Sequence, residues 1–534
     1  MSDSSKKQTF LHGAAWLAMA VAIVKVIGAL YKIPLKIIIG DQGYGYFVTA
    51  YDIYSVLLMI STAGLPVAMS RMVSQASARG HYNQVRRIFK TARALFLSMG
   101  FCSSALMVIF CHQLADFQRQ PDAWFAIMCL GPCAFLMCRV SSYRGFFQGQ
   151  GNMRPTSTSQ ILEALFKLII GLGAALAILH FTKDNSLAAG GAILGVTFGC
   201  LFSALFMYSQ FRPAYRSLPE TGDQEDSFGT TAKKLLVIAI PITIGSAGLQ
   251  LLTVLETNLY MGQLLGPLGM TQDQADITRG IYGMCQTVFN MPCSFIVPIT
   301  ISIIPAITAH LTMDDHKAAK ETQESAARIT GLISLPCSVG LCVLSRPVMA
   351  LLGSYSGERL DLAASLMSVL GICVFLYSVV QLTNAMMQAH GYAHIPVINM
   401  LLSGCMKLAV VYILVGNPNI GIMGAAIGAV LCYLCIAILN VLALNRTVSE
   451  KPALIRNLLR SLFPALVMGA IVFGTYQGLI ALLGAGTSRI ILCGLPIMVG
   501  VAVYVVAAVV CKSITREDCM LLPKGEKIAK LLRL

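Results

Sequence analysis

The chain has 534 residues, of which 56% are hydrophobic and only 12% are charged, and its formal net charge is +15. A soluble domain carries about 25% charged residues, so this composition excludes an ordinary soluble globular protein and predicts a polytopic membrane protein. The positive charge by itself would suit nucleic acid or anionic lipid. In a membrane protein, however, it follows from lysine and arginine in cytoplasmic loops, and we expect no nucleic-acid partner.

Apolar stretches of about 20 residues can cross the hydrocarbon core as helices. Fourteen such stretches follow one another along the chain, at residues 14–38, 46–72, 91–114, 123–147, 159–181, 188–211, 234–260, 279–309, 329–350, 363–388, 395–416, 420–445, 457–483 and 489–512. We expect the span at 279–309 to be kinked, because it contains Pro292, Pro298 and Pro305.

Lysine and arginine orient these spans. They are concentrated in the N-terminal segment, in the connections on the same side, and in the C-terminal tail. The opposite connections hold only a few basic residues, which we place at Arg119, Lys183, Arg279, Arg346, Arg359 and Arg489. This asymmetry predicts a multi-pass membrane protein with both termini in the cytoplasm.

A polar stretch after the fourth span, YRGFFQGQGNMRPTSTSQ at residues 143–160, has a counterpart after the tenth span. Three residues in or just after this stretch recur 240 positions later: Gln148, Gly151 and Lys167 correspond to Gln388, Gly391 and Lys407. A shared offset indicates an internal duplication. The offset covers six spans, an even number, so both copies have the same orientation in the membrane.

Two parallel six-helix lobes are therefore predicted, related by an axis along the membrane normal as in transporters. The N-terminal lobe covers residues 1–211, a cytoplasmic linker covers 212–233, and the C-terminal lobe covers 234–445. Residues 446–534 hold the last two spans and a basic cytoplasmic tail.

Three lysines lie on one face of the first span. Lys25, Lys32 and Lys36 are seven and four residues apart, which places them on one stripe of a helix. A charged side chain at the helix centre costs about 2.5–3.5 kcal/mol, so we expect this stripe to face a wet interior and to bind an anionic substrate, with Lys25 the strongest candidate. The alternative is that the lysines reach the membrane surface or pair with acids, and Asp52 is placed to pair with Lys32.

Other polar side chains of the spans are weaker candidates for the same cavity: Arg71, Glu256, Gln250, Asn258 and Asn290. Arg71 lies near the cytoplasmic end of its span and can extend to the surface, and the neutral side chains can instead make helix-packing contacts. Lys167 follows Glu163 by four residues, and we expect a local ion pair between them.

Motifs of enzymes are missing from the sequence. No Walker-type loop, HExxH or GxSxG motif stands out, and the CxxC pair at Cys432 and Cys435 has no second pair or suitably spaced histidines. The sequence predicts a transporter without a cofactor or metal site. Its energy source stays open among the membrane potential, Na⁺ and H⁺.

Three stretches resemble one family: GALYKIPLKIIIGDQGYGYF (28–47), AYDIYSVLLMISTAGLPVAMSRMVS (50–74) and YRGFFQGQGNMRPTSTSQILE (143–163). They are similar to the stage V sporulation protein B/YtgP group of polysaccharide-export transporters, in the MATE-like superfamily that includes the MurJ lipid II flippases. The resemblance implies an all-α fold of 14 transmembrane helices, a central cavity open alternately to each side, and a lipid-linked cell-wall precursor as substrate. It also implies that Lys25 stands where MurJ-type proteins carry a basic cavity residue, with Tyr31 at the next such position and Lys32 where an acid often stands. In MurJ the last two helices form a groove for the lipid tail.

We therefore predict a flippase for an undecaprenyl-diphosphate-linked glycan, most specifically lipid II, that works by alternating access. Its expected partners are membrane lipids and the cell-wall synthesis machinery. The alternatives are a flippase for another polyprenyl-linked polysaccharide, including a spore-cortex variant, and a MATE-type cation-coupled multidrug exporter. A non-transporting scaffold for envelope synthesis is the third class of hypothesis.

Overall fold

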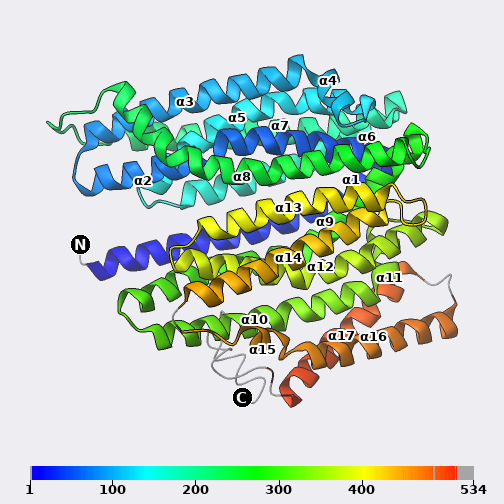
Figure 1. The fold of residues 1–534 in the computed structure, drawn as a ribbon. Coiled ribbons are helices and arrows are strands. Elements are labelled where there is room, and N and C mark those ends of the chain that lie inside the picture. The colour runs from blue at the N-terminus through cyan, green and yellow to red at the C-terminus, as the bar shows by residue number, and fades with distance from the viewer. Residues whose placement is uncertain (1–2, 449, 485–487, 512, 514–534) are drawn as a thin grey trace. The chain divides into compact units, whose positions relative to one another are not determined.

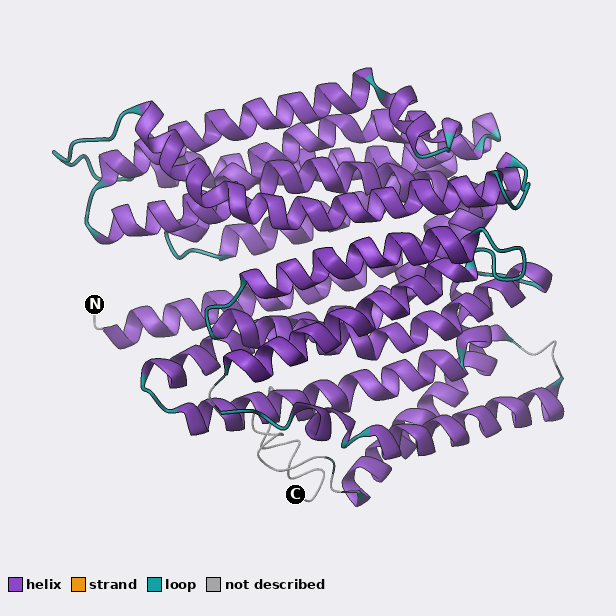
Figure 2. Ribbon diagram, in the orientation of Figure 1, coloured by secondary structure: helices purple, strands orange, loops and turns teal. Residues whose placement is uncertain are grey.

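A computed structural model describes residues 3–448, 450–484, 488–511 and 513, without the side chains of residues 3–19, 21, 22, 25, 29, 249, 297–302, 305 and 306. These residues form helices and connecting loops with no strand (Figure 2), which confirms the predicted all-α class. Contacts within the chain define two compact units, a first unit up to Gly283 and a second unit from Met284 onward.

The helices follow each other along the chain with short connections (Figure 1). The first unit holds α1 (Asp3–Thr62), α2 (Gly64–Ala78), α3 (Tyr82–Ile109), α4 (Cys111–Phe117), the 3₁₀ turn η1 (Pro121–Ala123), α5 (Trp124–Gly149), α6 (Arg154–Thr182), α7 (Asn185–Arg216), α8 (Phe228–Leu265) and the start of α9 (Gln272–Thr312). The second unit holds the rest of α9, α10 (His316–Val343), α11 (Ser345–Leu352), α12 (Gly357–Ala389), α13 (His394–Val415), α14 (Met423–Thr447), α15 (Leu454–Leu459), α16 (Leu462–Leu483) and α17 (Arg489–Val510).

Twelve helical segments among the described residues are long and apolar enough to cross a membrane. The first of them, Val26–Ala78, includes a reversal at Gly40, whose φ of 70° and ψ of −175° interrupt the helical geometry of α1. Glycine adopts a positive φ without the strain that a Cβ would add. The chain therefore turns at Gly40 between the two first predicted spans.

The second predicted span, 46–72, is not one helix. It is divided where α1 ends at Thr62 and α2 begins at Gly64. Pro66 explains the break, because a proline ring has no N–H to donate to the carbonyl four residues earlier, which is that of Thr62, and clashes with it.

The duplicated turns have the same local structure. Gly151 follows α5 with φ 74°, and Gly391 follows α12 with φ 86°. The N–H of Gly151 donates to the carbonyl of Gln148 at 3.0 Å, and that of Gly391 donates to the carbonyl of Gln388 at 3.1 Å. The order of elements also agrees, since short helices, α4 and α11, follow α3 and α10.

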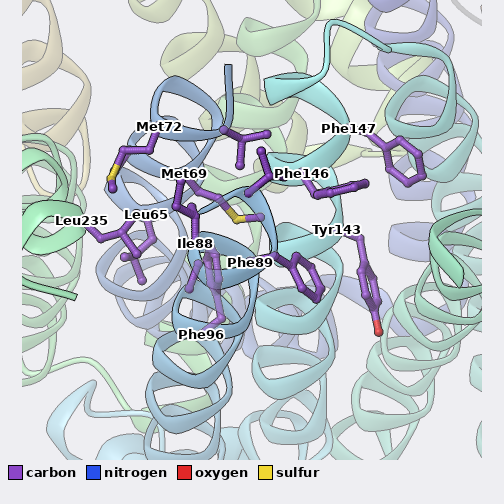
Figure 3. Close-up of a cluster of buried hydrophobic side chains, with 14 of the residues drawn as sticks. Leu65, Met69, Met72, Ile88, Phe89, Phe96, Tyr143, Phe146, Phe147 and Leu235 are labelled. Atoms are coloured by element: carbon purple, nitrogen blue, oxygen red, sulfur yellow. The ribbon is translucent and has the colours of Figure 1, made fainter. Parts of the chain in front are cut away.

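The core of the first unit lies where α2, α3, α5, α7 and α8 meet (Figure 3). Phe89 stacks on Phe211 with ring centroids 4.3 Å apart and on Tyr143 at 6.2 Å. Part of the polar stretch 143–160 is thus a packing element, since its aromatic residues are buried here. The members of this core that Figure 3 labels are Leu65, Met69, Met72, Ile88, Phe89, Phe96, Tyr143, Phe146, Phe147 and Leu235.

Helix α8 packs with the helices that precede it. It contacts α1, α2 and α3, and its residues Leu235 and Ala239 belong to the first core. A Cβ built on Gly64 would lie 2.1 Å from the carbonyl oxygen of Ala239, so glycine permits this close approach of α2 and α8. The boundary between the two compact units therefore lies after Gly283, downstream of the predicted linker at residues 212–233. That linker remains our prediction for the junction of the two sequence repeats.

The connection between α7 and α8 is bound to the first turn of α3. The carboxylate of Asp223 accepts hydrogen bonds from the backbone N–H groups of Gln84 at 2.9 Å and Asn83 at 3.2 Å. Helix N-termini leave such N–H groups without intrahelical acceptors, so the connection supplies an N-cap from a distant part of the chain. Glu225 adds an ion pair with Arg87 at 2.8 Å.

This cap should be released by acid. Partial desolvation tends to raise the pKa of Asp223, but hydrogen bonds from Thr221 and from the N–H groups of Gln84 and Asn83 outweigh it and hold the pKa below its ordinary value. A carboxyl whose folded pKa is lowered stabilises fully above its unfolded pKa, about 3.9, and loses that effect as the pH falls through the folded pKa. Protection of the Asn83 and Gln84 amides from hydrogen exchange should fall over that range. Asp223→Asn should be less protected at neutral pH and lack the acid transition; an identical transition in this variant would refute the assignment.

Candidate functional site

A cavity of about 310 Å³ opens within the first unit between α1, α5 and α6. Apolar residues of α1 form one wall, including Val24, Ile27 and Gly28. The polar side chains that line it are Tyr31, Arg144, Gln160, Glu163 and Lys167. Two of these side chains are basic and one is acidic.

Hydrogen bonds fix the guanidinium of Arg144. Its Nη2 donates to Glu163 at 3.1 Å and to Ser203 at 3.4 Å, and its Nε donates to Ser159 at 3.1 Å. These acceptors lie on α6 and α7, while Arg144 lies on α5. The ion pair with Glu163 is largely buried, with the Arg144 side chain 12% exposed.

Lys167 does not make the ion pair predicted with Glu163, because that carboxylate pairs with Arg144. Its Nζ instead donates a 2.7 Å hydrogen bond to the hydroxyl of Tyr51. It also lies 4.9 Å from the ring centroid of Tyr31 and 4.8 Å from that of Tyr51. Tyr31 is held in turn by its hydroxyl, which donates to the carbonyl of Ala192 at 2.9 Å. Two aromatic faces therefore flank the ammonium group.

Glycines set the positions of these helices. A Cβ on Gly195 of α7 would lie 2.2 Å from the Cα of Gly171 on α6, and one on Gly199 would lie 2.6 Å from the carbonyl oxygen of Glu163. The backbones of α6 and α7 can approach this closely only without side chains at these points. Glu163 and Lys167 thus lie where α6 and α7 are closely packed.

The lysines of the predicted stripe on α1 do not share one environment. The side chain of Lys25 lies outside the described residues. Lys32 is half-buried and close enough to Asp52 for an electrostatic interaction. Lys36 is buried, and its Nζ lies 3.0 Å from a carboxylate oxygen of Asp41. Lys36 therefore has the acidic partner that our alternative hypothesis described.

Asp52 is part of a buried ion-pair cluster. Arg279 of α9 donates to its carboxylate, and the hydroxyl of Thr257 donates to it at 3.4 Å. Glu256 of α8 is 4% exposed and interacts electrostatically with both Asp52 and Arg279. The structure thus brings together Lys32, Asp52 and Glu256, three of the predicted residues.

Arg279 was wrongly predicted to lie in a connection. Helix α9 begins at Gln272, about two turns earlier, and Arg279 is 1% exposed. The start of α9 was not recognised in the sequence because Asp273 and Asp276 lower the hydropathy of its first turns. Neighbours satisfy these acids: Asp276 accepts hydrogen bonds from Gln120 at 2.8 Å, Gln272 at 2.9 Å and Tyr46 at 3.1 Å.

The remaining predicted residues lie elsewhere. Arg71 is exposed on α2, and Gln250 is half-buried on α8. Asn258 donates to the carbonyl of Phe117, which is a packing contact. Asn290 is exposed in the second unit and donates to the carbonyl of Gln286 at 2.8 Å.

The second unit carries an apolar groove of about 540 Å³ on its last two helices. Aliphatic and aromatic side chains line it, with the thiol of Cys511 at one end and no charged group. Its main lining residues are Phe463, Val467 and Ile471 of α16 and Val503, Val506 and Val510 of α17.

Comparisons with known proteins agree with this architecture. The sequence model of the family described as polysaccharide biosynthesis protein matches residues 10–311, and the MatE family model matches residues 278–413. An uncharacterized membrane protein of Bacillus subtilis (strain 168), YabM, is 26% identical over 549 residues, covering 100% of this chain and 99% of YabM. Stage V sporulation protein B of the same organism is 24% identical over 450 residues, covering 82% of this chain and 84% of that protein. The solved structure of the lipid II flippase MurJ in an inward closed conformation matches with a TM-score of 0.69 at 12% identity, over 92% of this chain and 98% of that one. The fold is therefore that of MurJ and MATE proteins.

Proposed function

Because the chain belongs to the polysaccharide biosynthesis protein family, we propose that it is a flippase that moves a lipid-linked cell-wall precursor across the bacterial cell membrane, and that this precursor is lipid II. The fold and the relatives are those of membrane transporters and flippases, not of enzymes. The name lipid II flippase belongs to MurJ of B. subtilis, which is 24% identical over 74% of this chain.

The observation that carries this proposal is the apolar groove between α16 and α17. A groove of about 540 Å³ lined by hydrocarbon side chains suits van der Waals contact with a polyprenyl chain in the membrane. A small cationic drug has no need of such a surface. The groove therefore favours a lipid-linked substrate.

The head group of such a substrate carries a diphosphate, and the basic residues of the first unit suit it. In the proposed mechanism Lys25 and Lys32 of α1 attract the diphosphate, because charge-assisted hydrogen bonds strengthen where water is excluded. The sugars contact neutral polar side chains while the undecaprenyl tail stays in lipid. Rocking of the two repeats about the site then exposes the head group on the other side. Both termini are cytoplasmic in this proposal, and the membrane potential, Na⁺ or H⁺ drives the cycle.

Reconstitution into liposomes tests the function directly. Labelled lipid II and other undecaprenyl-diphosphate-linked sugars are supplied in one leaflet, and their accessibility to a membrane-impermeant reagent is followed under an imposed voltage, Na⁺ gradient or pH gradient. We expect lipid II to be translocated in excess over protein-free liposomes. No translocation of any of these lipids under any gradient would refute the proposal.

Lys25→Ala tests the site that we propose on α1. Loss of one charge-assisted contact, about 1.5–3 kcal/mol, should reduce translocation about tenfold or more and abolish growth of a flippase-depleted strain. Arg346→Ala, at an exposed ion pair of the second unit, serves as the control for loss of a cation. Normal growth with Lys25→Ala at unchanged membrane expression would remove Lys25 from the mechanism.

A MATE-type cation-coupled exporter is the second candidate, favoured by the MatE match over residues 278–413. Coupling to a cation would require carboxylates able to bind it. Asp52 already pairs with Arg279, which makes this candidate weaker. Raised drug resistance in efflux-deficient cells expressing the chain would support it.

A further inference from the structure

The polar cavity of the first unit contains N–H donors beyond those that the described residues accept. An ammonium group has three N–H donors, and Lys167 uses one of them with Tyr51. Arg144 makes its hydrogen bonds through Nε and Nη2. Its Nη1 has no acceptor among the residues that the structure describes. Both side chains line the cavity, so a group bound there would lie beside these two cations.

The charges of the lining residues do not balance. Arg144 and Lys167 carry two positive charges, and Glu163 carries one negative charge that is paired with Arg144. One positive charge, that of Lys167, therefore remains without an anionic partner within ion-pairing distance among the described residues. A ligand with one negative charge would complete the set.

Aromatic rings compensate this charge only in part. The attraction of a cation to a tyrosine face is weaker than the cost of removing an ammonium group from water. The two tyrosines therefore orient the Lys167 ammonium without replacing an anion. A pre-oriented cation of this kind is suited to ligand binding, because its side chain is already ordered.

The size of the cavity limits the ligand. Ligand pockets of proteins typically measure about 300–1,000 Å³, and this one is at the small end, at about 310 Å³. It can hold a phosphate or carboxylate group with its nearest atoms, but not a whole glycan. Oxyanions accept several hydrogen bonds at once, which matches the separate donors of Lys167 and Arg144.

We propose that this cavity binds a single oxyanion, a phosphate or a carboxylate, between Lys167 and Arg144. The assignment rests on the proposed function only for the source of that group, which is then the diphosphate or a carboxylate of the transported lipid. Anion binding itself is independent of transport. Lys167 is the specificity-determining residue, since it carries the charge that the ligand neutralises.

Calorimetric titration of the full chain in detergent, in low-chloride buffer, tests this assignment with inorganic phosphate, inorganic diphosphate and acetate. We expect the wild-type protein to bind at least one of them with one site. Lys167→Met should weaken binding by about tenfold or more, which corresponds to about 1.4 kcal/mol, and Lys167→Arg should retain it. Stronger binding of phosphate or diphosphate identifies a phosphate site, and stronger binding of acetate identifies a carboxylate site.

Lys407→Met is the matched control, because Lys407 occupies the duplicated position in the second unit; its anion binding should equal that of the wild type. If Lys167→Met does not fold, Gln160→Leu removes a neutral amide from the same cavity and should also weaken binding. Absence of anion binding by the wild type, or equal binding by wild type and Lys167→Met, would overturn the assignment. Anion binding without translocation of any lipid would refute the proposed function and leave this site intact.

Discussion

Arg279→Met should lower the free energy of unfolding by about 3–5 kcal/mol, because removal of one partner of a buried ion pair leaves an uncompensated charge. Arg279 is 1% exposed and faces two carboxylates, those of Asp52 and Glu256. Without the guanidinium these carboxylates would repel each other in a site with little water. Thermal or denaturant unfolding in detergent micelles measures the loss.

Asp52→Asn should be milder than Arg279→Met, because Glu256 still offers Arg279 a negative charge. The double variant Asp52→Asn/Arg279→Met should be more stable than Arg279→Met alone, and a double-mutant cycle gives the interaction energy. Additive effects of the two substitutions would show that the pair does not interact as the structure indicates.

Arg346→Met provides the matched control for this cluster. Arg346 pairs with Asp361 at 2.5 Å, but the two side chains are 53% and 59% exposed. Exposed ion pairs contribute about 0–1 kcal/mol, so this substitution should change stability little. The two substitutions thus compare the stability lost when an arginine is replaced by methionine in a buried and in an exposed Arg–Asp pair.

Gly195→Ala should be among the most damaging methyl additions in the first unit. Its Cβ would lie 2.2 Å from the Cα and 2.3 Å from the N of Gly171, and backbone atoms cannot rotate away as a side chain can. Overpacking commonly costs about 1–3 kcal/mol and sometimes more, and we expect at least the upper end here. The separation of α6 from α7 would also displace Glu163 and Lys167 from the cavity.

Gly173→Ala on α6 is the control, since nothing lies within 4 Å of a Cβ built there. Alanine favours the helix over glycine by about 1 kcal/mol, so this variant should be as stable as the wild type or more so. Yield of folded protein and thermal unfolding distinguish the two variants. Equal behaviour of both would contradict the close packing of α6 and α7.

Much of the fold could be predicted because membrane spans follow from uninterrupted hydrophobic length. The turn with Gly151 and its repeat with Gly391 could also be recognised, since a positive φ restricts the residue type locally. The break before Gly64 was missed although Pro66 signals it, because hydropathy continues across both helices. In that case local backbone chemistry outweighed a hydrophobic pattern that suggested a single span.

The site could be predicted only in part, because partners are set by tertiary contacts. Spacing placed Lys167 beside Glu163, but the carboxylate pairs with Arg144 from another helix. Nothing in the sequence links Lys167 to Tyr51, which lies 116 positions earlier. Arg279 was missed for a related reason. A hydropathy scale treats the charged residues at the start of α9 as exposed, whereas side chains from other segments form hydrogen bonds with Asp273, Asp276 and Arg279.

The association of α8 with the first unit has a consequence for dissecting the protein. A gene cut at the start of the acidic connection would give a front fragment without Leu235 and Ala239. The fragment would also lack Asp223, whose carboxylate caps α3. Such a fragment should precipitate or be degraded, whereas one extended through Gly283 keeps these groups together. Co-expressed pieces intended to reassemble should accordingly be divided downstream, inside α9, rather than at the acidic loop where the alignment of repeats would suggest.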